Sequence, residues 1–100
     1  MNNDLIKFCK QGNLKAVKRL VREMGKTGAS LEQTDDLNWT ALIMASVHAN
    51  LKIVRVLVKA MLQAGANVDG VGNHGQTALM YAIHSDNLEI IKCLVKAGLM

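Results

Sequence analysis

Three glycines, Gly70, Gly72 and Gly75, form the pattern in this sequence most suggestive of a cofactor site. They satisfy the G-x-G-x-x-G signature of dinucleotide binding, in which glycines allow the backbone to approach a pyrophosphate. The signature also requires a buried strand before the loop, whereas a helical segment and Gly65 precede it here. We therefore interpret these glycines as turn residues and predict no cofactor.

The tripeptide Gly25-Lys26-Thr27 resembles the end of a phosphate-binding P-loop. The first glycine of that motif would fall at position 20, which is Leu20, and no strand pattern precedes it. We predict neither a nucleotide site nor a small-molecule substrate from this tripeptide.

The histidines and cysteines are the remaining candidates for metal binding or catalysis. His48, His74 and His84 contain no pair four residues apart and have no cysteine near them in sequence. We expect solvent-facing histidines at helix ends rather than metal ligands. Cys9 and Cys93 are predicted to be core residues rather than nucleophiles. No Ser/His/Asp set or carboxylate pair has a catalytic spacing, so we predict that the protein is not an enzyme.

The composition indicates one folded, helical domain. The chain has 100 residues, of which 50% are hydrophobic and 20% charged, which is typical of a globular protein. Aromatic residues make up only 3% and proline is absent, so aliphatic side chains must form the core and helices are favoured. No apolar run reaches the roughly 18 residues of a membrane span. The N-terminal residues do not resemble a signal peptide and the cysteines form no CxxC, so we expect an intracellular, cytoplasmic protein.

The net charge of +4 is concentrated near the N-terminus, where residues 1–26 contain seven basic and two acidic residues. Five of these basic residues follow helical spacing and form one basic face: Lys15, Lys18, Arg19, Arg22 and Lys26. We favour a solvated outer face, because no aromatic residues alternate with the cations to stack on bases. The alternative is a protein that binds an anionic surface, either nucleic acid or an acidic membrane.

An internal repeat of 37 residues organises the chain. The sequence Asn-Leu-Lys-Ala-Val at 13–17 returns in related form at 50–54 and 87–91, and Thr-Ala-Leu at 40–42 returns at 77–79. Each unit is predicted to hold two helices. The first helices are expected at 4–11, 41–49 and 78–86, and the second begin at Leu14, Leu51 and Leu88. The expected N-caps are Asn3, Thr40 and Thr77, and the expected C-caps are Gly28 and Gly65.

These units resemble ankyrin repeats over nearly the whole chain. The resemblance is carried by Thr-Ala-Leu-Ile-Met-Ala at 40–45, Asn-Leu-Lys-Ile-Val at 50–54 and Gly-Ala-Asn-Val-Asp at 65–69. It implies an all-α, ankyrin-type solenoid of three helix–turn–helix repeats with extended hairpin-like connections. The single domain would cover 1–100, with repeats at approximately 1–36, 37–73 and 74–100, the last truncated.

The sequence departs from the family pattern in two ways. Ala41 and Ala78 replace the usual proline, and Ile43 and Met80 replace the usual histidine. The period exceeds the ankyrin value of about 33 by four residues, which fall at 24–27 and again at 61–64. Because a helical turn contains about 3.6 residues, we predict second helices that are longer by one turn. Gly25 makes this extension less favourable in the first unit.

Equivalent positions in the three units predict how the two ends differ. Two positions are charged in the first unit and apolar in the later ones. Lys7 aligns with Met44 and Tyr81, and Arg19 aligns with Val56 and Cys93. We expect these positions to pack against the preceding repeat, so the first unit has the polar outer face of a terminal cap. The third unit shows no comparable polar face. We therefore predict that these residues are the N-terminal part of a longer array, or that a partner or a second copy of the chain covers this end.

The resemblance also implies a partner-binding surface at the hairpin tips and at the ends of the first helices. Carried over by position, it comprises Asp36, Leu37, Trp39, Val47, His48, Asn73, His74, Gln76, His84 and Ser85, with Lys10 and Gln11 in the first unit. Trp39 is the single tryptophan, and it is either a binding anchor or a packed residue. We predict a protein-interaction module, an adaptor or scaffold, whose partner is another protein. A structural spacer within a larger protein is the further alternative.

Overall fold

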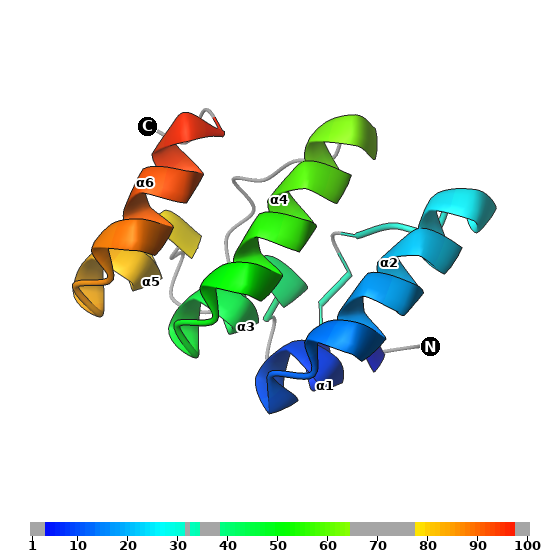
Figure 1. Ribbon diagram of the computed structural model, residues 1–100, viewed down its shortest axis with the longest axis horizontal. Coiled ribbons are helices and arrows are strands. Elements are labelled where there is room, and N and C mark those ends of the chain that lie inside the picture. The colour runs from blue at the N-terminus through cyan, green and yellow to red at the C-terminus, as the bar shows by residue number, and fades with distance from the viewer. Residues whose placement is uncertain (1–3, 32, 35–38, 65–77, 98–100) are drawn as a thin grey trace.

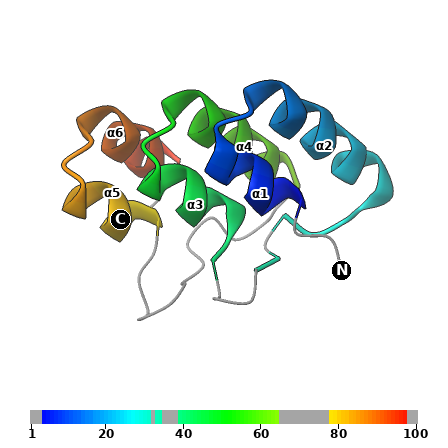
Figure 2. The same ribbon diagram turned by 90° about the horizontal axis from the view of Figure 1, so that it is seen from below.

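Six α-helices alternate between two layers in the computed structural model, which describes residues 4–31, 33–34, 39–64 and 78–97. One layer holds the first helix of each repeat and the other holds the second (Figures 1 and 2). The bounds are α1 Asp4–Gln11, α2 Leu14–Thr27, α3 Ala41–Val47, α4 Leu51–Ala64, α5 Ala78–His84 and α6 Leu88–Lys96. The predicted all-α solenoid of helix–turn–helix repeats is confirmed.

The second helices begin where the sequence predicted, because an asparagine precedes each of them. The side-chain oxygens of Asn13, Asn50 and Asn87 accept hydrogen bonds from the backbone N–H three residues later, at 3.1, 3.2 and 3.2 Å. Each bond satisfies one of the N–H groups that a helix leaves unpaired at its start. The capping role was not predicted, although the signal was present in the sequence, because asparagine is a preferred N-cap residue.

Two predicted helix ends were wrong by two residues. Helix α3 ends at Val47 rather than at 49, and α5 ends at His84 rather than at 86. The reason is a left-handed turn residue at one position in every repeat. The φ values of Gly12, Ala49 and Asp86 are 72°, 56° and 58°. A residue with this φ cannot continue a right-handed helix, so the chain reverses there and enters the second helix.

The predicted extra turn is confirmed in both units. Helices α2 and α4 each contain 14 residues and extend to Thr27 and Ala64. Helix α2 continues through Gly25 and ends at Gly28, whose φ of 75° is left-handed and whose N–H donates to the Met24 carbonyl. This is the glycine C-cap that the sequence predicted.

Helix α3 lies at the centre of the core. It contacts α1 and α5 in its own layer and α4 across it, and residues 41–46 are all buried. Thr40 caps it as predicted, because its Oγ1 accepts a hydrogen bond of 3.1 Å from the Ile43 N–H. Thr34 and Thr40 form an isolated antiparallel bridge in the connection before it. The predicted caps at Asn3, Gly65 and Thr77 lie outside the described residues.

The two ends of the stack differ in the way that the repeat comparison predicted. Lys7 and Arg19 are exposed on the first repeat, whereas the later residues at both positions are buried or half-buried. On the last repeat, Met80 and Ile83 are 51% and 57% exposed. The residues equivalent to Met80 are Ile6 and Ile43, and those equivalent to Ile83 are Cys9 and Ser46. All four are no more than 5% exposed. The face of α5 and α6 therefore exposes positions that a following repeat covers elsewhere in the stack.

Candidate protein-interaction surface

The predicted partner-binding positions that the structure describes lie at the ends of the first helices. Helices α1, α3 and α5 lie side by side, so equivalent residues at their C-terminal ends form a row along this layer (Figure 2). His48, His84 and Ser85 are exposed and Val47 is half-buried. In the first repeat, Lys10 and Gln11 are exposed at the matching positions. The other predicted residues lie outside the described part of the chain: Asp36, Leu37, Asn73, His74 and Gln76.

Trp39 contacts an aromatic residue of the next repeat. Its ring is half-buried and lies 5.2 Å from the ring of Tyr81, centroid to centroid, with 34° between the ring planes. Offset or tilted rings at this separation attract each other beyond the effect of burial alone. Trp39 therefore packs between the second and third repeats while part of its ring stays open to solvent.

The Ser85 hydroxyl fixes the end of α5 beside this aromatic pair. It donates a hydrogen bond of 2.8 Å to the backbone carbonyl of Tyr81. In the central repeat, the buried Ser46 hydroxyl makes a similar bond of 2.9 Å to the carbonyl of Leu42. Both hydroxyl groups are therefore satisfied within their own helices.

The two thiols are not activated for nucleophilic chemistry. Burial raises the pKa of the Cys9 thiol from 9.0 to about 12. Burial also raises the pKa of Cys93, against smaller lowering effects of Arg55 and Lys96. A raised pKa keeps a thiol protonated at neutral pH, and the protonated form is a poor nucleophile and metal ligand. Within the described residues there is no group of three or more His, Cys, Asp or Glu side chains able to hold a metal ion. The Gly70–Gly75 pattern falls outside the residues that the structure describes.

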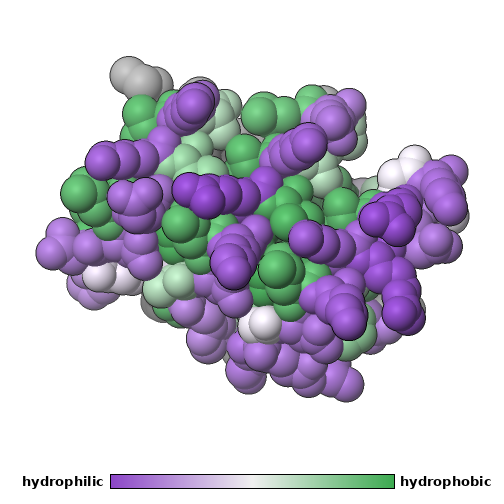
Figure 3. Space-filling model, in the orientation of Figure 1, coloured by the Kyte–Doolittle hydropathy of each residue, from purple (hydrophilic) through white to green (hydrophobic). Residues whose placement is uncertain are grey.

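The basic residues extend over all three second helices, beyond the basic face predicted at 15–26. Of the 12 lysines and arginines, ten lie on α2, α4 and α6, together with only two of the eight acidic residues. Figure 3, in the orientation of Figure 1, shows these polar side chains surrounding patches of apolar surface on the second-helix layer. The signal was present in the sequence, because two rows of cations follow the 37-residue repeat: Lys18, Arg55 and Lys92, and Arg22, Lys59 and Lys96.

The predicted basic face at 15–26 is divided by the packing of α2. Lys18 and Arg22 line an open groove against α4, whereas Lys15 and Arg19 line a smaller hollow beside α1. Lys26 lies 3.7 Å from Glu23, measured from amine nitrogen to carboxylate oxygen, in an exposed ion pair. The five cations therefore remain on one exposed side of α2, but this side borders two different hollows.

None of the helices in the described parts of the chain has the length and apolar character needed to cross a membrane.

A profile of ankyrin repeats in three copies matches residues 5–99. The search of curated protein sequences returns no match.

Two solved structures share the fold. The first is the crystal structure of the ankyrin repeat domain of Bcl-3, described as a unique member of the IkappaB protein family. It has 31% sequence identity and a TM-score of 0.85, over 98% of this chain and 41% of that one. The second is the predatory endopeptidase Bd0816 from Bdellovibrio bacteriovorus in complex with immunity protein Bd3460. One chain of this complex has 32% sequence identity and a TM-score of 0.78, over 99% of this chain and 48% of that one.

This chain thus spans less than half the length of either matched chain. The profile match, the two-layer stack of helix pairs and the hairpin-like bridge before α3 all agree with the resemblance that the sequence motifs suggested. The chain belongs to the ankyrin-repeat family.

Proposed function

We propose that this chain is a protein-interaction module that binds another protein, as an adaptor or scaffold, through its first-helix surface. We define this surface by its described residues: Trp39, Val47, His48, His84 and Ser85. The observations that support it are the row of residues at the C-terminal ends of α3 and α5, most of them exposed, and the partly exposed Trp39 that precedes α3. Aromatic residues are common anchors of protein interfaces, and polar residues commonly form the rim.

The similar structures support an interaction function of this kind. Bd0816 is described as being in complex with an immunity protein, and the matched part of Bcl-3 is described as its ankyrin repeat domain. Repeat solenoids present extended surfaces because each repeat contacts only its neighbours, so binding positions recur at the repeat spacing. His48 and Ser85 recur in this way, as do Val47 and His84.

Site-specific photocrosslinking tests this assignment. A photoreactive phenylalanine is introduced at His48 or at His84, which are exposed positions whose replacement leaves the core intact. We expect both proteins to crosslink the same cellular protein. A matched protein carries the reactive group at Lys52, which is exposed on α4 in the other layer, and it should not crosslink that protein.

The crosslinked protein is then purified and titrated with the wild-type chain and with Trp39→Ala, under conditions where both are folded. If Trp39 anchors the partner, the affinity falls by about 2 kcal/mol or more. Crosslinking from Lys52 but from neither helix end would place the interaction elsewhere and contradict the proposal.

We also propose that the end face of the third repeat, formed by Met80, Ile83, Leu88 and Val95, associates with a second copy of the chain. All four side chains are exposed and apolar. Single exposed apolar residues are ordinary, but a group of them on one face is typical of an interaction surface. Sedimentation of the wild-type chain should show dimers that Ile83→Glu dissociates, whereas Lys7→Glu at the opposite end should not affect them. A chain that stays monomeric at high concentration would contradict this second proposal.

A further inference from the structure

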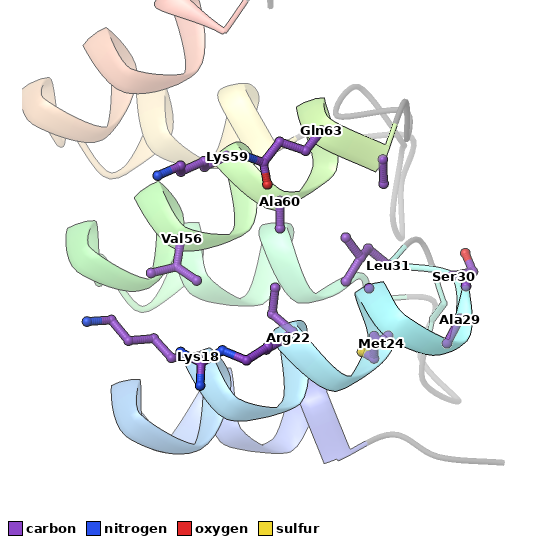
Figure 4. Close-up of a pocket in the computed structure, with 14 residues that line it drawn as sticks. Lys18, Arg22, Met24, Ala29, Ser30, Leu31, Val56, Lys59, Ala60 and Gln63 are labelled. Atoms are coloured by element: carbon purple, nitrogen blue, oxygen red, sulfur yellow. The ribbon is translucent and has the colours of Figure 1, made fainter.

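An open groove of about 780 Å³ runs along the second-helix layer between α2 and α4. Its floor is apolar and includes Val21 from α2, Val56 and Ala60 from α4, and Leu31 from the connection that follows α2. Figure 4 shows Val56 and Ala60 pointing from α4 toward α2. The groove lies on the layer opposite the first-helix surface, so it is separate from the binding role proposed above.

The four added residues of each repeat lengthen the walls of this groove. Met24 and Gly25 come from the extra turn of α2, and Gln63 and Ala64 come from the extra turn of α4. A Cβ placed on Gly25 would meet no atom within 4 Å, so the groove is open at this point. The lining residues extend over 18–28 on the α2 side and over 56–64 on α4, so these walls are about 14–16 Å long, which is the length of a helix of roughly three turns.

Among the described residues, the charged side chains that line the groove are all positive. They are Lys18 and Arg22 on α2 and Lys59 on α4, all three exposed, and no acidic residue of the described ranges lines the groove. None of these three cations forms an ion pair with a described residue. The ion pairs seen among the described residues join Lys26 to Glu23 and Lys92 to Glu89. Several positive charges beside an apolar surface create a local potential that attracts an anionic ligand.

We propose that this groove binds an acidic amphipathic helix from a partner protein. A helix of about three turns matches the length of the walls, and its apolar face presents side chains at i, i+3, i+4 and i+7 to an apolar floor. Carboxylates on either side of that face lie next to Lys18, Arg22 and Lys59. The charges then select the orientation and accelerate the encounter, while burial of the apolar face supplies most of the affinity.

The shape of the groove favours this ligand over other anions. Nucleic acid phosphates would pair with the cations but would leave the apolar floor exposed to water, and none of the residues that line the groove is an aromatic one able to stack on a base. A bilayer surface is flat on this scale and cannot reach the floor between two helices. An acidic helix accounts for both the charged walls and the apolar floor.

The test uses the whole chain and a synthetic peptide as the probe. The peptide is about three turns long, with leucines on one helical face and glutamates flanking them. It is titrated into isotope-labelled protein and followed by NMR. We expect saturable binding with the largest shifts at Val21, Val56 and Ala60. A peptide of the same composition in scrambled order, which has no apolar face, should not produce these shifts.

Two variants test the walls and the floor separately. The triple variant Lys18→Glu, Arg22→Glu, Lys59→Glu should weaken peptide binding about 10- to 100-fold, since three exposed charge pairs are lost. The control Lys7→Glu, Lys10→Glu, Lys52→Glu changes the net charge equally at exposed sites outside the groove and should leave the affinity unchanged.

The variant Gly25→Phe introduces a ring where the structure has open space, and it should block the peptide without lowering the melting temperature. The proposal is wrong if the amphipathic peptide does not bind, or if the scrambled peptide binds equally well. It is also wrong if the control triple variant weakens binding as much as the groove variant does. Vesicles of phosphatidylserine and phosphatidylcholine should not bind the protein; if they bind in a manner that requires the three groove cations, the site recognises a membrane instead.

Discussion

Replacing Trp39 with alanine should lower the free energy of unfolding by about 3–4 kcal/mol. Most of Trp39 is buried, and about two-thirds of a large aromatic side chain corresponds to roughly 130 Å² of apolar surface, or about 3 kcal/mol at 25 cal/mol per Å². The contact with the Tyr81 ring, at a centroid distance of 5.2 Å, adds about 0.5–1.5 kcal/mol. Residual burial in the unfolded chain reduces the sum, which gives the range stated.

A double-mutant cycle isolates the ring contact from general burial. The proteins Trp39→Ala, Tyr81→Ala and the double variant are unfolded in urea and followed by helical circular dichroism. Fluorescence is unsuitable because Trp39 is the single tryptophan. We expect a coupling energy of about 0.5–1.5 kcal/mol between the two residues. The control pairs Trp39→Ala with Phe8→Ala in the first repeat, where the two effects should add.

Coupling below about 0.3 kcal/mol between Trp39 and Tyr81 would refute the reasoning, because additivity holds within that error for residues that do not interact. The same proteins separate packing from binding. A variant that loses stability but retains partner affinity assigns Trp39 to the contact between repeats, whereas a loss of about 2 kcal/mol in affinity assigns it to the interface.

The remaining predictions concern caps, glycines and thiols. Thr40→Ala should reduce stability by about 1 kcal/mol and the melting temperature by about 4–8 °C, and Thr40→Ser should largely restore both. Gly25→Ala should stabilise the protein by about 0.5–1 kcal/mol, since Gly25 lies within α2 with free space for a Cβ. Gly28→Ala should instead destabilise it by about 1–2 kcal/mol because of its left-handed φ, and equal effects at both glycines in urea unfolding would contradict this. Iodoacetamide at pH 8 should modify Cys93 before Cys9, as mass spectrometry would show, because Cys9 is fully buried. The pKa of the Cys9 thiol is about 12 in the folded protein, against an ordinary value of 9.0. The thiol therefore contributes its full stabilisation below pH 9 and loses it as the pH rises toward 12. Over that range, the free energy of unfolding should fall less for Cys9→Ala than for the wild-type protein.

The repeat register made most of the fold predictable. Residues that recur every 37 positions must occupy equivalent places in equivalent helix pairs, so the apolar spacing, Thr40 and Gly28 located the helices without further information. The ends of α3 and α5 were less accessible, because Ala49 and Asp86 adopt a left-handed φ that neither residue type reveals. Gly12 at the equivalent position carried the signal, and comparing it with Ala49 would have corrected both ends.

The candidate site was predictable only in part. Val47, His48, His84 and Ser85 were predicted from the ankyrin resemblance, carried over by position, and they lie at the C-terminal ends of α3 and α5 or directly after them. The contact between Trp39 and Tyr81 joins residues of different repeats, and no local pattern specifies which side chains meet across such a boundary.

The sequence by itself determined the repeat, the helix pairs, the extra turn and the exposed cations of the first unit, because each depends on residue spacing along one helix. Only the tertiary structure decided how those cations are used. Lys18 and Arg22 share one helix with Lys15 and Arg19, yet the packing of α4 beside α2 brings the first two together with Lys59 over an apolar groove. Residues separated by about 40 positions meet there because helices pack laterally, and lateral contacts are set by the stack of repeats as a whole.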